Sequence, residues 1–422
     1  MKRVLFSLML MFVATGLTFA QEKSVKAAKA AASDVKPDFK KAEQLIDGAL
    51  TNPETKDDPE TWNVAGFIQR RYNEEETKKS FLRQPYDTAG VYNSVLNMCK
   101  YFLKCDELAQ IPNEKGKVKN KYRKSNAATM LSERGNLING GIENYNKSKS
   151  KEALDFFGTY IDVTNAPMME DNPAVKGDTL LPQIAYYACL AASKIEDYPS
   201  ILKYAPYGED DPEYGKYTME FTSAALKALG KTDEWIASLK KGLEKYPDYA
   251  NFFANLVDYY NNNNKLDEAM SYTDEMLSKS PNNSFFLYVK GYLYQNQYAS
   301  LKNEKNDDKA AADVLLKAIE YYKKAVEADP KNAEAYSNLG FVYCLQAQDY
   351  SEKISATTDV NDPKYKEDQT ALKSFYEKAR PCYEKARELK PEQNALWLQG
   401  LYRVYYNLNM GPEFEAIEKL MQ

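Results

Sequence analysis

The stretch EADPKNAEAYSNLGFVY, residues 327–343, joins the end of one helical pattern to the start of another. Pro330 stands at the junction, and proline does not continue a helix. The pattern after it closes on Leu339, Gly340 and Tyr343. A small residue among large ones is typical of a place where two helices approach closely. The stretch therefore predicts a helix-turn-helix junction.

The junction recurs along the chain at a fixed period. Pro247, Pro281, Pro330 and Pro391 each follow a helical pattern. The first two are 34 residues apart, and the next intervals are 49 and 61 residues, which are 34 plus insertions of 15 and 27. A recurring period of this length indicates repeated helical units that stack on one another.

The residues within each period resemble the tetratricopeptide repeat (TPR) family. The first helix of its pattern is matched by Tyr336, Leu339, Gly340 and Tyr343, and the second by Ala379, Tyr383, Ala386 and Pro391. The match is stronger over residues 216–393 and weaker over 37–215. There, Trp62 and Gly66 suggest a first helix, but its partner near residues 92–108 lacks the pattern.

The resemblance implies an all-α solenoid of stacked helix-turn-helix repeats over residues 37–422, wound into a superhelix. The two insertions predict two lengthened repeats near the C-terminus, and residues 394–422 are expected to cap the array. No single unit can bury its apolar face alone, so stacking of neighbours supplies the core.

The N-terminus predicts export. Residues 1–20 combine Lys2 and Arg3, an apolar core and a small-residue cleavage site, which indicates a cleaved signal peptide. The apolar run is short for an uncleaved anchor, and no later stretch predicts a membrane span. Since no cysteine stands directly after the cleavage site and the first one is Cys99, we expect a periplasmic or secreted, soluble protein without a lipid anchor. Residues 21–36, rich in Ala and Lys, are expected to be a flexible leader.

The composition argues against an enzyme. The chain has no histidine, which excludes the commonest neutral-pH proton shuttle and metal ligand. No catalytic, cofactor or metal motif is present, and we expect none of these sites. The acidic runs at residues 74–76 and 209–211 are interpreted as solvated turns. A net charge of −5 makes nucleic acid an unsuitable partner, and the basic run at 115–126 is interpreted as a solvated loop.

The five cysteines are odd in number and widely spaced, and most lie in apolar helical patterns. We expect buried, inert thiols, with a disulfide between Cys344 and Cys382 as the alternative.

The resemblance also points to the free positions of each first helix as a partner-binding groove on the concave face. These are Asn251, Ala254, Asp258, Asn261, Asn262, Phe285, Tyr288, Tyr292, Gln295, Asn296, Glu334, Ser337, Phe341, Cys344 and Leu345. All except Ala254, Asn261, Cys344 and Leu345 form the candidate site. The alternative is that these side chains contact neighbouring helices. The position-five lysines of the carboxylate-binding sub-type are absent, since Glu220, Ala254, Tyr288 and Ser337 stand there.

These observations favour a non-catalytic protein–protein interaction scaffold of the bacterial cell envelope, which binds an unidentified protein or peptide. The alternative is a glycan-binding component of a polysaccharide-uptake system.

Overall fold

The computed structural model describes residues 22–112, 115–118, 120–247, 249–303, 307–357 and 359–421. Over these residues the chain forms helices and turns without a β-strand, which confirms the all-α prediction. It divides into two compact units, unit 1 up to Phe252 and unit 2 from Phe253 onward. The predicted signal peptide lies outside the described residues.

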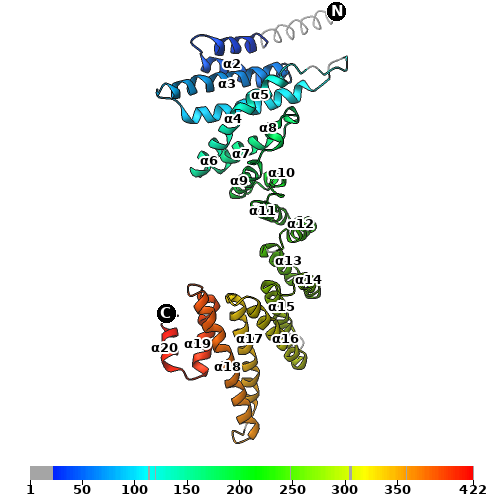
Figure 1. Ribbon diagram of the computed structural model, residues 1–422, viewed down its shortest axis with the longest axis vertical. Coiled ribbons are helices and arrows are strands. Elements are labelled where there is room, and N and C mark those ends of the chain that lie inside the picture. Colours follow the sequence, from blue (N-terminus) through cyan, green and yellow to red (C-terminus); the bar gives the residue numbers. More distant parts are fainter. Residues whose placement is uncertain are drawn as a thin grey trace, which may run out of the picture. The chain divides into compact units, whose positions relative to one another are not determined.

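Unit 1 contains a described helical segment at residues 22–33 and a series of paired helices (Figure 1). Its elements are α2 (Phe39–Thr51), α3 (Pro59–Phe81), α4 (Thr88–Ala109), α5 (Arg123–Glu133), α6 (Gly135–Asn146), α7 (Ser150–Thr164), η1 (Pro167–Met169), α8 (Pro173–Lys176), α9 (Leu181–Lys194), α10 (Tyr198–Tyr204), η2 (Ala205–Tyr207), α11 (Gly215–Ala228) and α12 (Thr232–Lys245).

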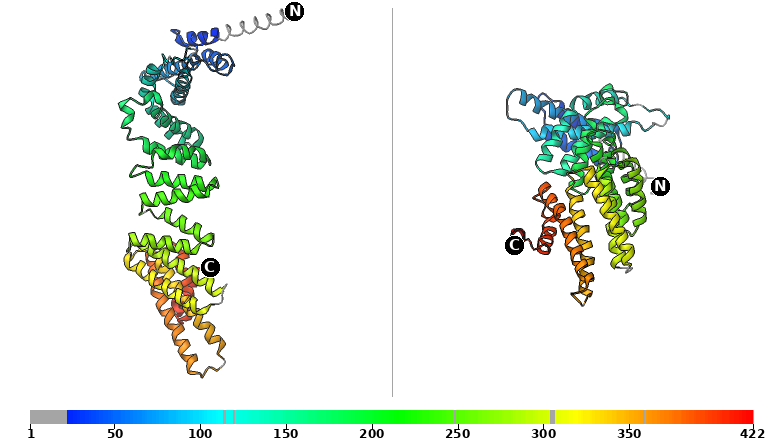
Figure 2. Two further views of the ribbon diagram at one scale, coloured as in Figure 1. Left: turned by 90° about the vertical axis from the view of Figure 1, so that its right-hand side faces the viewer. Right: turned by 60° about the horizontal axis from the view of Figure 1, so that its bottom comes forward.

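Unit 2 follows the same plan, and helix α13 (Ala250–Asn262) contains the boundary between the units. Its elements are α14 (Leu266–Lys279), α15 (Ser284–Asn303), α16 (Asp308–Ala328), α17 (Ala333–Ala356), α18 (Pro363–Leu389), η3 (Asn394–Leu396), α19 (Leu398–Asn407) and α20 (Gly411–Glu418). Figure 2 shows α15–α16 and α17–α18 as two long hairpins, which are the predicted lengthened repeats.

The repeated prolines mark the ends of second helices, as the sequence predicts. Helix α14 ends two residues before Pro281, α16 two residues before Pro330, and α18 two residues before Pro391. The residue preceding a proline is biased away from the helical conformation, so each helix stops at this point and the chain turns into the next unit.

A glycine of one helix lies against an aromatic ring of the next at many helix pairs. In each case a Cβ atom added to the glycine would come within 3.0 Å of the ring. The pairs are Gly66–Phe102, Gly140–Phe156, Gly141–Phe157, Gly242–Phe252, Gly291–Tyr322 and Gly340–Tyr383. The first pair shows that α4, whose sequence lacks the family pattern, packs on α3 by the same rule.

Tyr383 of α18 takes part in two such contacts. A Cβ atom on Gly340 of α17 would lie 2.8 Å from its Cε2 atom, and one on Gly400 of α19 would lie 2.3 Å from its Cε1 atom. The buried ring therefore has a glycine at each edge, and these contacts set the spacing of the three helices.

The Ala-rich segment after residue 21 differs from the predicted flexible leader. Residues 22–33 are helical, and Val25, Ala28 and Ala32 are buried in a cluster with Ala42 and Ile46. The prediction required large side chains for burial, but the small side chains of Ala28 and Ala32 are buried completely and allow this helical segment to approach its neighbours closely.

Replacing Gly400 with Ala is expected to destabilise unit 2 by about 1–3 kcal/mol, because the new Cβ atom would overlap the Tyr383 ring. Gly411→Ala is the matched control, since nothing lies within 4 Å of its Cβ position. Urea unfolding followed by circular dichroism tests this difference. Equal midpoints for the two variants would contradict the role given to the glycine–ring contact.

Candidate functional site

A cavity of about 310 Å³ lies in unit 2 against the first helices of three successive repeats, α15, α17 and α19. We call it the Arg403 pocket. Its lining residues are Gln295, Ser337, Asn338, Phe341, Cys344, Tyr383, Ala395, Leu396, Gln399, Gly400 and Arg403. The second helix α18 contributes only Tyr383, so the pocket lies mainly on the first-helix side of the repeats.

A second cavity of about 410 Å³ lies between α15 and α17. We call it the Lys302 pocket. Its lining residues are Gln295, Asn296, Tyr298, Ala299, Lys302, Asn303, Phe341, Leu345, Gln348 and Glu352. Gln295 and Phe341 line both pockets, which are therefore adjacent parts of one groove.

The two pockets differ in charge. Arg403 is exposed, is the one charged residue lining its pocket, and has no ion pair with any described residue. Lys302 instead pairs with three acidic groups, at 3.0 Å from Asp308, 3.0 Å from Asp349 and 3.2 Å from Glu352. Burial acts to lower the pKa of Lys302, but these hydrogen bonds raise it above its usual range. The groove therefore has an uncompensated positive charge at Arg403.

A hydrogen-bonded chain orients the amide groups between the pockets. Asn338 donates its Nδ2 hydrogen to the hydroxyl of Tyr322 over 3.2 Å, and that hydroxyl donates to Gln295 Oε1 over 2.9 Å. Tyr322 is completely buried, and burial raises its pKa well above the ordinary value, so it stays a hydrogen-bond donor. With its oxygen occupied, Gln295 retains its NH2 group as a donor for the groove.

The predicted site residues Gln295, Ser337 and Phe341 line the Arg403 pocket, and Asn296 lines the Lys302 pocket. Phe341 is the most accessible of them, with 38% of its surface exposed. Ser337 is buried and donates its hydroxyl hydrogen to the carbonyl of Leu396, so it connects α17 to η3. Glu334 pairs with Lys390. Ser337 and Glu334 thus contact neighbouring elements, as the alternative interpretation predicts.

The remaining predicted residues do not line either pocket. Phe285 and Tyr288 belong to a row of rings, with centroids 6.5 Å apart, and Tyr288 also lies 5.9 Å from Tyr322. Tyr292 is half-buried, and Asp258 and Asn262 are exposed on α13. In unit 1, Asn251 donates to the carboxylate of Glu220.

Residues 315–346, which run from α16 into α17, match the family model of the TPR repeat. The chain therefore contains a TPR repeat at these residues. This match covers the later part of α16 and the first part of α17, including Gly340.

Several solved structures are also similar to this chain. A TPR repeats protein from Bacteroides fragilis NCTC 9343 is 18% identical, with 65% of this chain and 98% of that chain covered and a TM-score of 0.31. The C-terminal part of a TPR repeat-containing protein from Cytophaga hutchinsonii is 15% identical, with coverages of 66% and 92% and a TM-score of 0.37. Yeast Tom70 is 13% identical, with coverages of 89% and 84% and a TM-score of 0.31.

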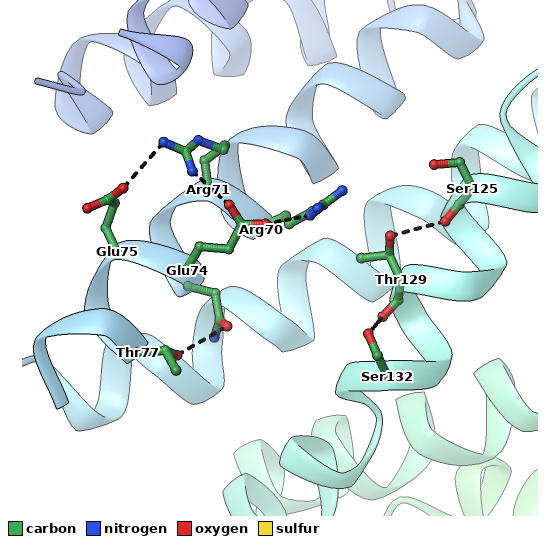
Figure 3. Close-up of polar contacts among 9 residues, drawn as sticks. Arg70, Arg71, Glu74, Glu75, Thr77, Ser125, Thr129 and Ser132 are labelled. Atoms are coloured by element: carbon green, nitrogen blue, oxygen red, sulfur yellow. Dashed lines mark hydrogen bonds and ion pairs between the residues drawn. The ribbon is translucent and has the colours of Figure 1, made fainter. Parts of the chain in front are cut away.

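The acidic run at residues 74–76 is neutralised by neighbouring cations, and Figure 3 shows those of Glu74 and Glu75. Glu74 lies 2.7 Å from both Arg70 and Arg71, and Glu75 lies 3.3 Å from Arg71. Burial acts to raise the pKa of Glu74, but the hydrogen bonds from the two guanidinium groups lower it overall. It therefore lacks the raised pKa that a general acid needs at neutral pH.

Sequence reasoning missed Arg403, Gln399 and Lys302. The first two lie on α19, which the sequence assigns to the cap, so its side chains were not considered for the groove. Lys302 lies in the inserted segment, which has no equivalent position in the repeat pattern. The first-helix positions, carried past Pro391, give Ala395, Leu398, Tyr402, Tyr405 and Tyr406. The repeat pattern therefore does not indicate Gln399 or Arg403.

No helix in the described part of the chain is both long and apolar enough to cross a bilayer.

All five cysteines are buried and free, as predicted, and Cys344 and Cys382 form no disulfide. Burial raises the pKa of Cys99 above its usual range and the pKa of Cys344 to about 12. A thiol with a raised pKa carries little of the reactive thiolate at neutral pH.

Iodoacetamide at pH 7.5 is accordingly expected to label none of the five cysteines in the folded protein and all five in urea, since unfolding restores the ordinary thiol pKa (pH 7.5 is roughly one unit below that value). Mass spectrometry of the intact chain counts the labels. Labelling of Cys344 under native conditions would contradict its enclosure in the wall of the Arg403 pocket.

Proposed function

We propose that this TPR protein is a non-catalytic scaffold of the bacterial cell envelope that holds a segment of a partner protein in the groove of unit 2. The observation that carries the proposal is the pair of adjoining pockets on α15, α17 and α19, joined through Gln295 and Phe341. Ligand sites are concave and combine apolar walls with a few oriented polar groups, and this groove has both features.

The charge of the groove favours an acidic partner segment. Arg403 presents a guanidinium group without a counter-ion in the described structure, and Gln295 adds an oriented NH2 group. A guanidinium binds a carboxylate through two parallel hydrogen bonds, which gives direction as well as attraction. Phe341 and Leu396 supply apolar walls for the neighbouring part of the segment.

The absence of catalysis is supported by chemistry, beginning with a sequence that has no histidine. Carboxylates of the two acidic runs form ion pairs: Glu74 pairs with Arg70, and Glu209 pairs with Lys241. The buried cysteines have raised pKa values, which disfavours a thiolate nucleophile. Location in the envelope rests on the export pattern of residues 1–20.

A photo-crosslinking residue, p-benzoylphenylalanine, at position 341 tests the groove in living cells. Crosslinking from this position is expected to capture the same protein repeatedly, because Phe341 borders both pockets. The matched control places the same residue at position 406, since Tyr406 is 66% exposed on α19 but lines neither pocket. Equal capture from both positions contradicts the groove, and capture of polysaccharide from position 341 supports the glycan-binding alternative instead.

Replacing Arg403 with Gln is expected to weaken binding of the captured partner by about ten- to hundredfold, because a hydrogen bond to a charged group is lost. Lys331→Gln serves as the control, since it removes an exposed cation at the turn before α17, away from the pocket lining. Calorimetric titration with the purified partner measures both affinities. Unchanged affinity in Arg403→Gln contradicts an acidic segment in this pocket.

A further inference from the structure

The turn between α3 and α4 in unit 1 exposes large apolar side chains. Phe81 is 84% exposed, Leu82 58% and Tyr86 42%. Together with Lys78 and Arg83 we call these residues the α3–α4 tip. The tip lies at one end of the paired helices α3 and α4, where no described element of unit 1 covers these three side chains (Figure 1).

Backbone hydrogen bonds hold this turn in one conformation. The Leu82 N–H donates to the carbonyl of Lys78 over 3.0 Å, and the Gln84 N–H donates to the carbonyl of Lys79 over 2.9 Å. Arg83 between them adopts the left-handed conformation, with φ of 56°, which is uncommon for a residue other than glycine. These contacts present Phe81 and Leu82 outward from a formed turn, so their exposure is not the result of a frayed helix end.

A buried carboxylate joins the far side of the turn to α3. Glu76 is 7% exposed and accepts a hydrogen bond of 2.8 Å from the N–H of Asp87. It also pairs with Lys79. Burial acts to raise the pKa of Glu76, but these bonds lower it overall, so it remains the charged acceptor at neutral pH.

The charged side chains next to Phe81 and Leu82 are positive. Asp87, next to Tyr86, is acidic, and its carboxylate accepts hydrogen bonds from the hydroxyl of Tyr72 and the N–H of Gly90. Lys78 and Arg83 are exposed and have no ion pair with any described residue. The acidic residues one turn earlier do not compensate them, because Glu74 and Glu75 are paired with Arg70 and Arg71 (Figure 3). The surface of the tip is therefore apolar at its centre and cationic at its edge.

The size of this surface argues for a lipid partner. Three side chains fall well short of the roughly 800 Å² that each partner buries in a stable protein–protein interface. A bilayer has no such requirement, because lipids rearrange around a small protruding group, and aromatic side chains and cations are favoured at its headgroup region.

We propose that the α3–α4 tip binds the surface of a bilayer that contains anionic lipids. Phe81 and Leu82 enter the boundary between headgroups and acyl chains, and Lys78 and Arg83 contact the headgroup phosphates. The proposal rests on unit 1 alone and is independent of the groove in unit 2.

The turn between α17 and α18 provides a matched comparison within the same chain. Val360 is 58% exposed there, as Leu82 is at the tip, but Asp359 and Asp362 flank it. An apolar residue at this second turn thus has the same exposure with the opposite charge around it.

The test introduces a tryptophan at one turn or the other, as Phe81→Trp or Val360→Trp, in the full chain. Vesicles of phosphatidylcholine and brominated phosphatidylglycerol are expected to quench the fluorescence of the Phe81→Trp variant selectively relative to the Val360→Trp variant. Vesicles of brominated phosphatidylcholine alone are expected to quench neither. Quenching is measured relative to the unsubstituted chain, because that chain already contains three tryptophans. The local signal separates the tip from any contact made by residues 1–20.

Charge removal gives the second measurement. Adding Lys78→Gln and Arg83→Gln to the Phe81→Trp variant is expected to raise the lipid concentration that gives half-maximal quenching by about thirtyfold. The expected loss is about 1 kcal/mol for each basic residue near an anionic surface. High salt is expected to have the same effect, since it screens exposed charges. Lack of quenching at position 81, equal quenching at both positions, or a signal that depends on protein concentration without vesicles would each overturn the proposal.

Discussion

The close approach of glycine and aromatic ring determines how the helices of this protein are spaced. From Gly66 on Phe102 in unit 1 to Gly340 on Tyr383 in unit 2, a ring occupies the volume that a Cβ atom would need. A ring gives a large apolar contact area, but only a glycine lets the facing backbone approach it closely. The contact therefore brings each helix near its neighbour and buries the ring in a single step.

This constraint explains how much of the fold could be predicted from the sequence. The period was visible because Pro281, Pro330 and Pro391 end helices at corresponding points. The α3–α4 pair was harder to recognise, because its ring is Phe102 on a helix that otherwise lacks the pattern. Residues 22–33 were missed for the opposite reason, since Ala28 and Ala32 are buried completely without any large side chain.

The candidate site could be predicted only in part, because the repeat pattern identifies free positions without showing what surrounds them. Gln295 and Phe341 line the Arg403 pocket. Ser337 also occupies a free position of the repeat pattern, but its hydroxyl donates a hydrogen bond to the carbonyl of Leu396, a residue 59 positions away in the chain. Arg403 lies beyond the recognisable repeats. The contact between Ser337 and Leu396 and the place of Arg403 in the pocket could be recognised only in the folded structure.

The ring of Tyr383 belongs to two parts of the molecule at once. It is packed between Gly340 and Gly400, and it also lines the Arg403 pocket. Folding of unit 2 is consequently linked to occupation of this pocket. A molecule that binds there only in the folded form would raise the free energy of unfolding of unit 2, and the increase would grow with the logarithm of that molecule's concentration.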